Sequence, residues 1–134
     1  MIKLAIRDIP YFDYSDFEIQ KEGVSYTIDT LKEFKKNYDN IDLIIGYDNL
    51  LTFDKWKNPD EIVKLAKLIV LRRETSSTKK MNNYFDCAIF LKSPIIEISS
   101  TEIRERVAKN KSINFLITKE VKEYIFKNNL YKKI

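Results

Sequence analysis

The sequence predicts an α/β fold with a mainly parallel sheet and flanking helices. Two short runs, Leu43-Ile44-Ile45 and Leu68-Ile69-Val70-Leu71, are apolar at every position, which is typical of strands buried on both faces of a parallel sheet. Helical patterns alternate with these runs along the chain, as in strand–helix–strand units. A chain of 134 residues has the size of one domain, and one of this length can bury about two-thirds of its unfolded surface.

The first third of the chain predicts a helix, an irregular strand and a second helix. Residues 1–8 resemble the tail of a helix, because three apolar side chains share one face. Residues 11–20 alternate apolar and polar side chains, which predicts an irregular strand. A helical stripe follows from 26 to about 38, and Ser25 or Thr27 is expected to cap its first turn.

The middle third predicts two buried strands joined by helical turns. The strands span 42–47 and 67–72. Between them, 49–53 forms one or two helical turns, and Asn58 followed by Pro59 is the signature of a helix start. The polar residues that follow the second strand are expected to form a loop.

The last third predicts two strands and two helices. The strands span 84–91 and 95–98, and a helix continues to about Lys109. Asn110 is suited to the left-handed position at its end. Thr118 is expected to cap the final helix.

Composition narrows the possible functions. The net charge is only +4, from 24 basic and 20 acidic residues, and the basic residues are scattered, which does not indicate a nucleic-acid surface. No apolar run approaches the length of a membrane span or a signal peptide. The single cysteine, Cys87, favours a reducing, cytoplasmic setting and is expected to pack inside an apolar strand. With no histidine in the sequence, a nucleophilic triad and a histidine-based metal site are excluded.

The segment Ser99-Ser100-Thr101-Glu102-Ile103-Arg104 is the most informative motif. Ser99 and Glu102 form the pattern of a capping box. Three hydroxyls then sit where a helix leaves its first N–H groups unpaired, and Arg104 adds a forked cation, so the segment can bind a phosphate. The alternative is an ordinary helix cap without a ligand.

Further polar residues follow the predicted strands. Gly46 and Asp48 after the first strand, with Trp56, could form a nucleotide pocket with a ribose contact and a stacking indole. The alternative is that Asp48 caps a helix and Trp56 packs in the core. The pair Arg72-Arg73 could bind a phosphate group, or it could be a solvent-exposed pair without a ligand. Ligands bind beyond the carboxyl ends of parallel strands, so these motifs and the serine-rich helix start are expected to share one rim.

Taken together, these residues resemble the bacterial nicotinate-nucleotide adenylyltransferase family. The resemblance runs through Ser25-Tyr26-Thr27-Ile28-Asp29-Thr30-Leu31, Ile45-Gly46-x-Asp48, Trp56, the segment 98–104, Tyr124-Ile125 and Leu130-Tyr131, in order and with matching spacing. It implies a Rossmann-like nucleotidyltransferase fold, with residues 1–134 forming one partial domain. It also implies adenylyl transfer from ATP to nicotinate mononucleotide with Mg²⁺, which gives nicotinate adenine dinucleotide and pyrophosphate in NAD biosynthesis.

The resemblance assigns a role to each matching position. It implies that nicotinate mononucleotide is bound by Thr27, the amide of Ile28, Asp48 and Trp56. The ATP side is then formed by the residues Gly46, Arg73, Ser99, Ser100, Thr101 and Arg104. No protein metal ligand is implied.

The chain departs from the family pattern in one important respect, since it contains no counterpart of the family's His-x-Gly-His motif. The chain is therefore expected to be a C-terminal portion that lacks the first strands, to be inactive alone, and to self-associate through an uncovered sheet edge. Two alternatives remain, a non-catalytic nucleotide-binding protein and a related transferase with another acceptor.

Overall fold

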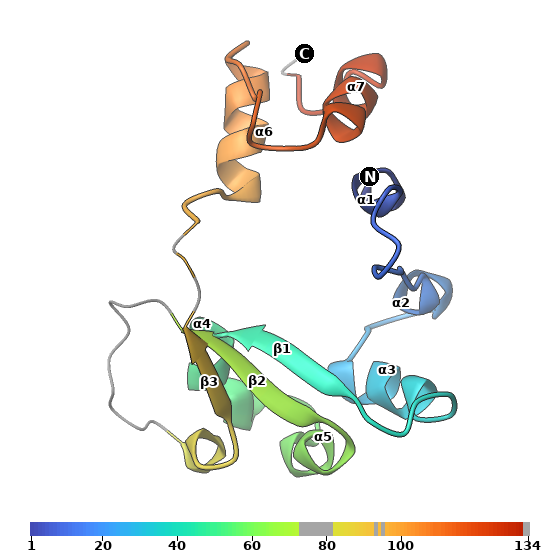
Figure 1. Ribbon diagram of the computed structural model, residues 1–134, viewed down its shortest axis with the longest axis vertical. Helices are drawn as coiled ribbons and strands as arrows, with labels where there is room; N and C mark the ends of the chain where they lie inside the picture. Colours follow the sequence, from blue (N-terminus) through green and yellow to red (C-terminus); the bar gives the residue numbers. More distant parts are fainter. Residues whose placement is uncertain (73–81, 93, 95, 133–134) are drawn as a thin grey trace. The chain divides into compact units, whose positions relative to one another are not determined.

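The computed structural model describes residues 1–72, 82–92, 94 and 96–132 (Figure 1). The chain folds into two compact units. One consists of Met1–Ser15 and Ile96–Ile134, and we call it the terminal unit. The other is Asp16–Ile95, the central unit. The predicted pyridine side belongs to the central unit, and the serine-rich motif belongs to the terminal unit.

A three-stranded parallel sheet forms the centre of the central unit. Its strands are β1 (Asp42–Gly46), β2 (Lys67–Arg72) and β3 (Ile89–Lys92), paired in the order β1-β2-β3. Ile45 pairs with Val70, which pairs with Phe90. Because all three strands run the same way, the carboxyl ends of β1 and β2 reach one edge of the sheet, and the predicted parallel α/β fold is confirmed.

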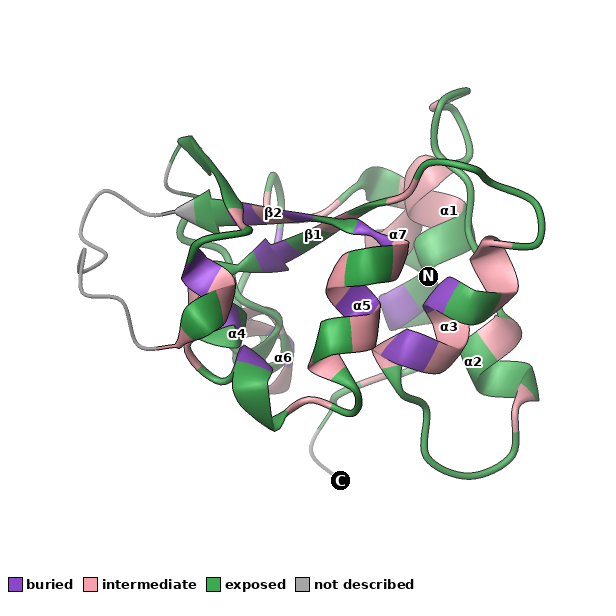
Figure 2. Cartoon of the chain, turned by 90° about the horizontal axis from the view of Figure 1, so that it is seen from below, coloured by how far each residue is buried: buried purple, intermediate pink, exposed green. Residues whose placement is uncertain are grey.

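Short helices connect these strands. They are α2 (Phe17–Gln20), α3 (Thr27–Phe34), α4 (Tyr47–Leu51) and α5 (Pro59–Leu65), with the 3₁₀ turns η1 (Phe53–Lys55) and η2 (Asn83–Phe85). Figure 2 shows α4 and α5 on one side of the sheet. The helix start at Asn58 and Pro59 is as predicted, but Asn58 makes no side-chain cap bond and has a left-handed backbone with φ 52°.

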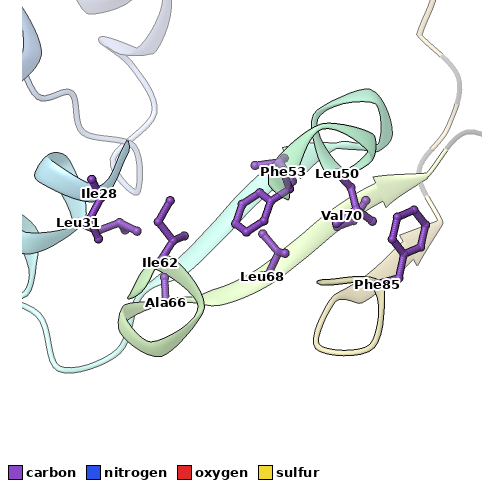
Figure 3. Close-up of a cluster of buried hydrophobic side chains, with 10 residues drawn as sticks. Ile28, Leu31, Leu50, Phe53, Ile62, Ala66, Leu68, Val70 and Phe85 are labelled. Carbon is purple, nitrogen blue, oxygen red and sulfur yellow. The ribbon is translucent and has the colours of Figure 1, made fainter. Parts of the chain in front are cut away.

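The core of the central unit lies between these helices and one face of the sheet. Leu50, Phe53 and Val70 are completely buried, and Figure 3 shows their side chains gathered with those of α3, α5 and η2. The other face of the sheet is also apolar. There Ile44, Leu71, Ile89 and Leu91 are exposed, with Ile44 at 60%.

The terminal unit is helical. It contains α1 (Ile2–Ile6), α6 (Ser100–Ala108) and α7 (Lys119–Lys127), with a small core of Val107, Ile113 and Ile125. The predicted left-handed Asn110 is confirmed at φ 52°. Thr118 caps α7 as predicted, since its Oγ1 accepts a hydrogen bond from the Val121 amide at 3.4 Å. No helix of the described residues is long and apolar enough to cross a membrane.

Three predicted strands are wrong in whole or in part. Residues 11–16 are irregular, and the strand predicted over 11–20 gives way to α2. Only the second half of 84–91 is a strand, because η2 occupies its start. Residues 96–98 form no strand, and Ile95 lies outside the described residues. Aromatic residues explain the first two errors, since they favour strands but can equally pack as isolated anchors.

Cys87 is a further correction. It lies between η2 and β3, is exposed, and its thiol donates a hydrogen bond to the Tyr84 carbonyl at 3.3 Å. It is therefore not packed inside a strand.

Candidate functional site

The serine-rich motif forms the N-terminus of α6. The Ser99 Oγ accepts a hydrogen bond from the Glu102 amide at 3.0 Å, which confirms the predicted cap. The other half of the capping box is not made. The Glu102 carboxylate instead accepts a hydrogen bond from Arg106 Nε at 2.8 Å. The Glu102 carboxylate is thus paired along the helix rather than with the amide of Ser99, and the helix dipole places its positive end at this start.

The hydroxyls and the arginine of this motif lie together at the surface. Arg104 Nη2 donates a hydrogen bond to Thr101 Oγ1 at 3.1 Å, and Ser100, Thr101 and Arg104 are all exposed. One helix start thus presents hydroxyl donors and one guanidinium to solvent. Their chemistry suits a phosphate group, which accepts several hydrogen bonds and pairs well with an arginine fork.

The start of α3 in the central unit is differently built. Tyr26 is its N-cap residue and makes no side-chain cap bond. The predicted caps are wrong, because the Ser25 hydroxyl donates to the Glu18 carbonyl at 3.1 Å and Thr27 is already the first helical residue. The first helical bonds come from Asp29 and the next residue to the Tyr26 carbonyl.

Two backbone amides therefore remain at the mouth of α3. Among the described residues, the amides of Thr27 and Ile28 donate to no carbonyl or side chain. The Thr27 side chain is half-buried, and that of Ile28 is anchored in the core at 1% exposure. A rigid pair of N–H groups beside a hydroxyl is an arrangement that can bind a carboxylate.

Trp56 precedes a residue that contacts this helix mouth. It follows η1, is half-buried, and packs on Phe53 with ring centroids 4.9 Å apart. The next residue, Lys57, places its Nζ 4.2 Å from the centroid of the Tyr26 ring and 3.8 Å from Asp29 Oδ2. These contacts connect the segment that carries Trp56 to the start of α3. Trp56 is therefore attached to the core without being enclosed by it.

Gly46 and Asp48 lie where β1 ends and α4 begins. Gly46 is the N-cap residue of α4, with φ −76° and ψ 158°. Asp48 is therefore not the cap, and it is exposed in the first turn. Its carboxylate has no hydrogen-bond or ion-pair partner among the described residues. An exposed carboxylate at the end of a parallel strand can accept hydrogen bonds from sugar hydroxyls.

A pair of lysines around Asp29 was not predicted from the sequence. Lys21 Nζ donates a hydrogen bond to Asp29 Oδ2 at 2.5 Å. This bond is the largest cause of a lowered pKa of the Asp29 carboxyl, opposed by burial and reinforced by the charges of Lys21, Lys57 and Lys32. The direct adjacency of Lys57 to Trp56 was the only sequence signal for this cluster.

Not every predicted site residue can be placed. Arg73 lies outside the described residues. Thr27, Ile28, Gly46, Asp48 and Trp56 belong to the central unit, while Ser99, Ser100, Thr101 and Arg104 belong to the terminal unit. The common rim of all the motifs therefore stays a prediction.

A cleft of about 560 Å³ lies at the opposite end of the strands. Asp42 and Lys67, the first residues of β1 and β2, line it together with Lys35 and Lys64. It contains none of the predicted site residues. The last residues of α5 also line the cleft. Lysines are common near the C-terminus of a helix because they balance the negative end of its dipole.

The chain is similar to known proteins in both sequence and structure. Residues 1–106 match the family model described as cytidylyltransferase-like. The chain is 43% identical to a probable nicotinate-nucleotide adenylyltransferase of Caldicellulosiruptor bescii, over 99% of this chain and 71% of the relative. It is 42% identical to a protein of the same description from Hydrogenobaculum sp., over 99% of this chain and 70% of the relative.

A solved structure is also similar. It is the Plasmodium falciparum nicotinic acid mononucleotide adenylyltransferase complexed with APC, with a TM-score of 0.58 and 25% identity. The match covers 82% of this chain and 60% of that chain. The present chain thus spans about 70% of the length of the curated relatives and less of the solved one.

Proposed function

The chain belongs to the nicotinate-nucleotide adenylyltransferase family of cytidylyltransferase-like proteins, and from this premise we propose that it serves adenylyl transfer from ATP to nicotinate mononucleotide. In that reaction a phosphate oxygen of the mononucleotide forms a bond to the α-phosphorus of ATP. The bond from that phosphorus to the β-phosphate bridging oxygen breaks, and pyrophosphate leaves. The products are nicotinate adenine dinucleotide and pyrophosphate.

The central unit supplies the pyridine side. The observation that carries this proposal is the half-buried Trp56, whose neighbour Lys57 contacts Tyr26 and Asp29 at the start of α3. The indole stacks on the pyridine ring, and the Thr27 and Ile28 amides bind its carboxylate. Asp48 accepts a hydrogen bond from the ribose. In-line transfer depends mainly on such orientation, because the two reacting groups must be held at bonding distance.

The terminal unit supplies part of the ATP side. Ser99, Ser100 and Thr101 hold phosphate oxygens at the start of α6, and Arg104 neutralises their charge. Gly46 lets the nucleotide approach the end of β1 closely. Arg73 is assigned to the same side by resemblance alone.

Magnesium enters this proposal with the nucleotide. The family typically uses Mg²⁺, but among the described residues no three aspartate, glutamate, histidine or cysteine side chains gather to hold a metal ion. Mg²⁺ commonly binds through substrate phosphates with few protein ligands. We therefore assign it to the phosphates of ATP and derive no step from a protein-bound ion.

The isolated 134-residue polypeptide is proposed to bind substrate but to transfer adenylate poorly. It contains no histidine, so the transition-state charge that the family's His-x-Gly-His motif stabilises lacks those donors. The loss of one preorganised donor typically costs about 100-fold or more in rate. Normal pyrophosphate release by this polypeptide would contradict this part of the proposal.

Titration with nicotinate mononucleotide tests the pyridine site directly. Trp56 is the only tryptophan, so its fluorescence reports stacking without interference, and we expect saturable quenching. By calorimetry, Trp56→Leu should weaken binding about tenfold or more, as expected for a lost aromatic stack. The matched control Tyr38→Leu removes an exposed aromatic beyond the C-terminal end of α3 and should leave affinity unchanged.

The outcomes separate the alternatives. Equal loss of affinity in both variants, or no binding by the unmodified chain, would contradict the pyridine site. Tight binding with no detectable pyrophosphate release favours the non-catalytic alternative, whereas slow but measurable release favours the transferase. Preference for a different acceptor favours a related transferase.

A further inference from the structure

The fold gains little stability from the fixed position of the Lys57 ammonium. Its side chain is 45% exposed, yet its ammonium is held over the Tyr26 ring and beside Asp29. Surface lysines normally lose conformational entropy when they are fixed in this way, and exposed ion pairs return little stability. An ammonium held at the mouth of α3 therefore invites a functional explanation.

The charges around Asp29 leave Lys57 available for a further partner. Lys21 is the close partner of Asp29 at 2.5 Å, whereas Lys57 lies 3.8 Å from the same oxygen. The nearby Glu18 carboxylate accepts a hydrogen bond from the Thr30 hydroxyl at 2.6 Å. Asp29 is thus largely neutralised by Lys21, and the cation–π contact holds Lys57 without consuming its hydrogen-bond donors.

The position of Lys57 defines what kind of ligand it can meet. It follows the proposed stacking residue Trp56 directly, and its ammonium lies over the residue whose carbonyl starts α3. The unpaired amides of Thr27 and Ile28 belong to the same helix start. A negative group placed on those amides would therefore come near an ammonium that is already positioned to receive it.

From these contacts we propose that Lys57 is a specificity-determining residue, which favours a pyridine nucleotide with a ring carboxylate over one with a ring carboxamide. This inference rests on the proposed function, because it assigns the ring substituent to the mouth of α3. Backbone amides can also bind a carboxamide oxygen, so N–H donors discriminate only in part. A full positive charge attracts the carboxylate and gains nothing comparable from a neutral amide.

The experiment compares two ligands that differ only in the ring substituent. Nicotinate mononucleotide and nicotinamide mononucleotide are titrated by calorimetry into the full chain and into Lys57→Gln. We expect Lys57→Gln to lower the affinity for nicotinate mononucleotide about threefold to tenfold, the range for a partly exposed charge pair. Binding of nicotinamide mononucleotide should change less than about twofold, because it presents no carboxylate to the lost charge.

Three further measurements separate charge from structure. Lys57→Arg keeps the charge and should restore most of the discrimination. Lys64→Gln removes a lysine of α5 that lines the cleft at the amino ends of the strands, and it should leave both affinities unchanged. The discrimination of the unmodified chain should also fall as salt rises from low to about 0.5 M, because exposed charges are screened.

The result that overturns the inference is an unchanged ratio of the two affinities in Lys57→Gln. That pattern includes an equal loss for both ligands, which would mean that Lys57 binds the phosphate that they share. A failure of the proposed function is distinguishable, since the unmodified chain would then bind neither mononucleotide.

Discussion

Gly46 is proposed for nucleotide binding, and the fold itself does not require a glycine there. Its backbone has a negative φ, and a Cβ at this position would meet no atom of the chain within 4 Å. Gly23 is different, because its φ of +87° lies in the region that only glycine adopts without strain. The sequence contains both glycines but does not show which of them the fold itself needs.

We therefore predict opposite effects for the two alanine variants. Gly46→Ala should change the free energy of unfolding by less than about 1 kcal/mol, while weakening ATP binding. Gly23→Ala should destabilise the chain by about 1 kcal/mol or more through backbone strain and leave ATP affinity intact. Urea unfolding and ATP titration calorimetry measure the two quantities. An unchanged ATP affinity in Gly46→Ala would remove Gly46 from the nucleotide site.

Asp29 gives a prediction for the dependence of stability on pH. Its folded pKa is lowered from the ordinary 3.8, first by the hydrogen bond from Lys21. A lowered folded pKa stabilises the native state above 3.8, and this contribution disappears as the pH falls through the folded value.

Asp29→Asn should therefore unfold at a lower urea concentration than the unmodified chain at pH 7, and the difference should shrink as the pH falls below 3.8. Asp48→Asn, which removes a carboxylate without a partner among the described residues, is the matched control and should show no such trend. If the difference in unfolding midpoint between the unmodified chain and Asp29→Asn did not vary with pH, the electrostatic cause would be excluded.

At the scale of the elements, helix starts were predicted best. Ser99 and Thr118 both cap their helices as their side chains indicate. Such caps are local, because a side chain two or three residues before an amide can reach it in any fold. The start of α3 was predicted in place, but its caps were not, because Ser25 bonds to the Glu18 carbonyl instead.

Paired cap variants separate stability from binding. Ser99→Ala and Thr118→Ala each remove one cap bond, at 3.0 Å and 3.4 Å respectively, and each should cost about 1 kcal/mol in the free energy of unfolding. Only Ser99→Ala should also weaken ATP binding, since only α6 carries the proposed phosphate site. Equal effects of both variants on ATP affinity would indicate that Ser99 acts only as a cap.

For the molecule as a whole, the apolar second face of the sheet has consequences for association. Ile44, Leu71, Ile89 and Leu91 form an exposed stripe across all three strands. Contiguous apolar surface of this kind is uncommon on monomers and promotes contact between copies. The sequence predicted self-association through an uncovered sheet edge; from the structure we expect this exposed face to be the surface through which the polypeptide self-associates.

Light scattering at increasing protein concentration measures this association. Ile44→Lys should shift the polypeptide toward monomer, because a charge on the stripe must be desolvated in any contact. Ile19→Lys, on the exposed face of α2 where Ile19 is 87% exposed, is the control and should leave the association unchanged. A monomer at all concentrations in the unmodified chain would contradict the expectation.

The sequence alone determined the features that depend on neighbours along the chain. The strands at 42–46 and 67–72 followed from unbroken apolar runs, and the starts of α5, α6 and α7 followed from capping residues. The family resemblance also needed only the order and spacing of residues. The single nucleotidyltransferase domain stays a prediction.

Tertiary structure decided the features that depend on residues distant in the sequence. Whether Trp56 is enclosed or accessible depends on how it packs on Phe53 and the rest of the core, and no local pattern encodes that. The contact of Lys57 with Tyr26 joins positions about thirty residues apart. The Lys21–Asp29 ion pair joins the residue that ends α2 to the first turn of α3. Such contacts form only when helices dock on the sheet, because burial and electrostatics act through space rather than along the chain.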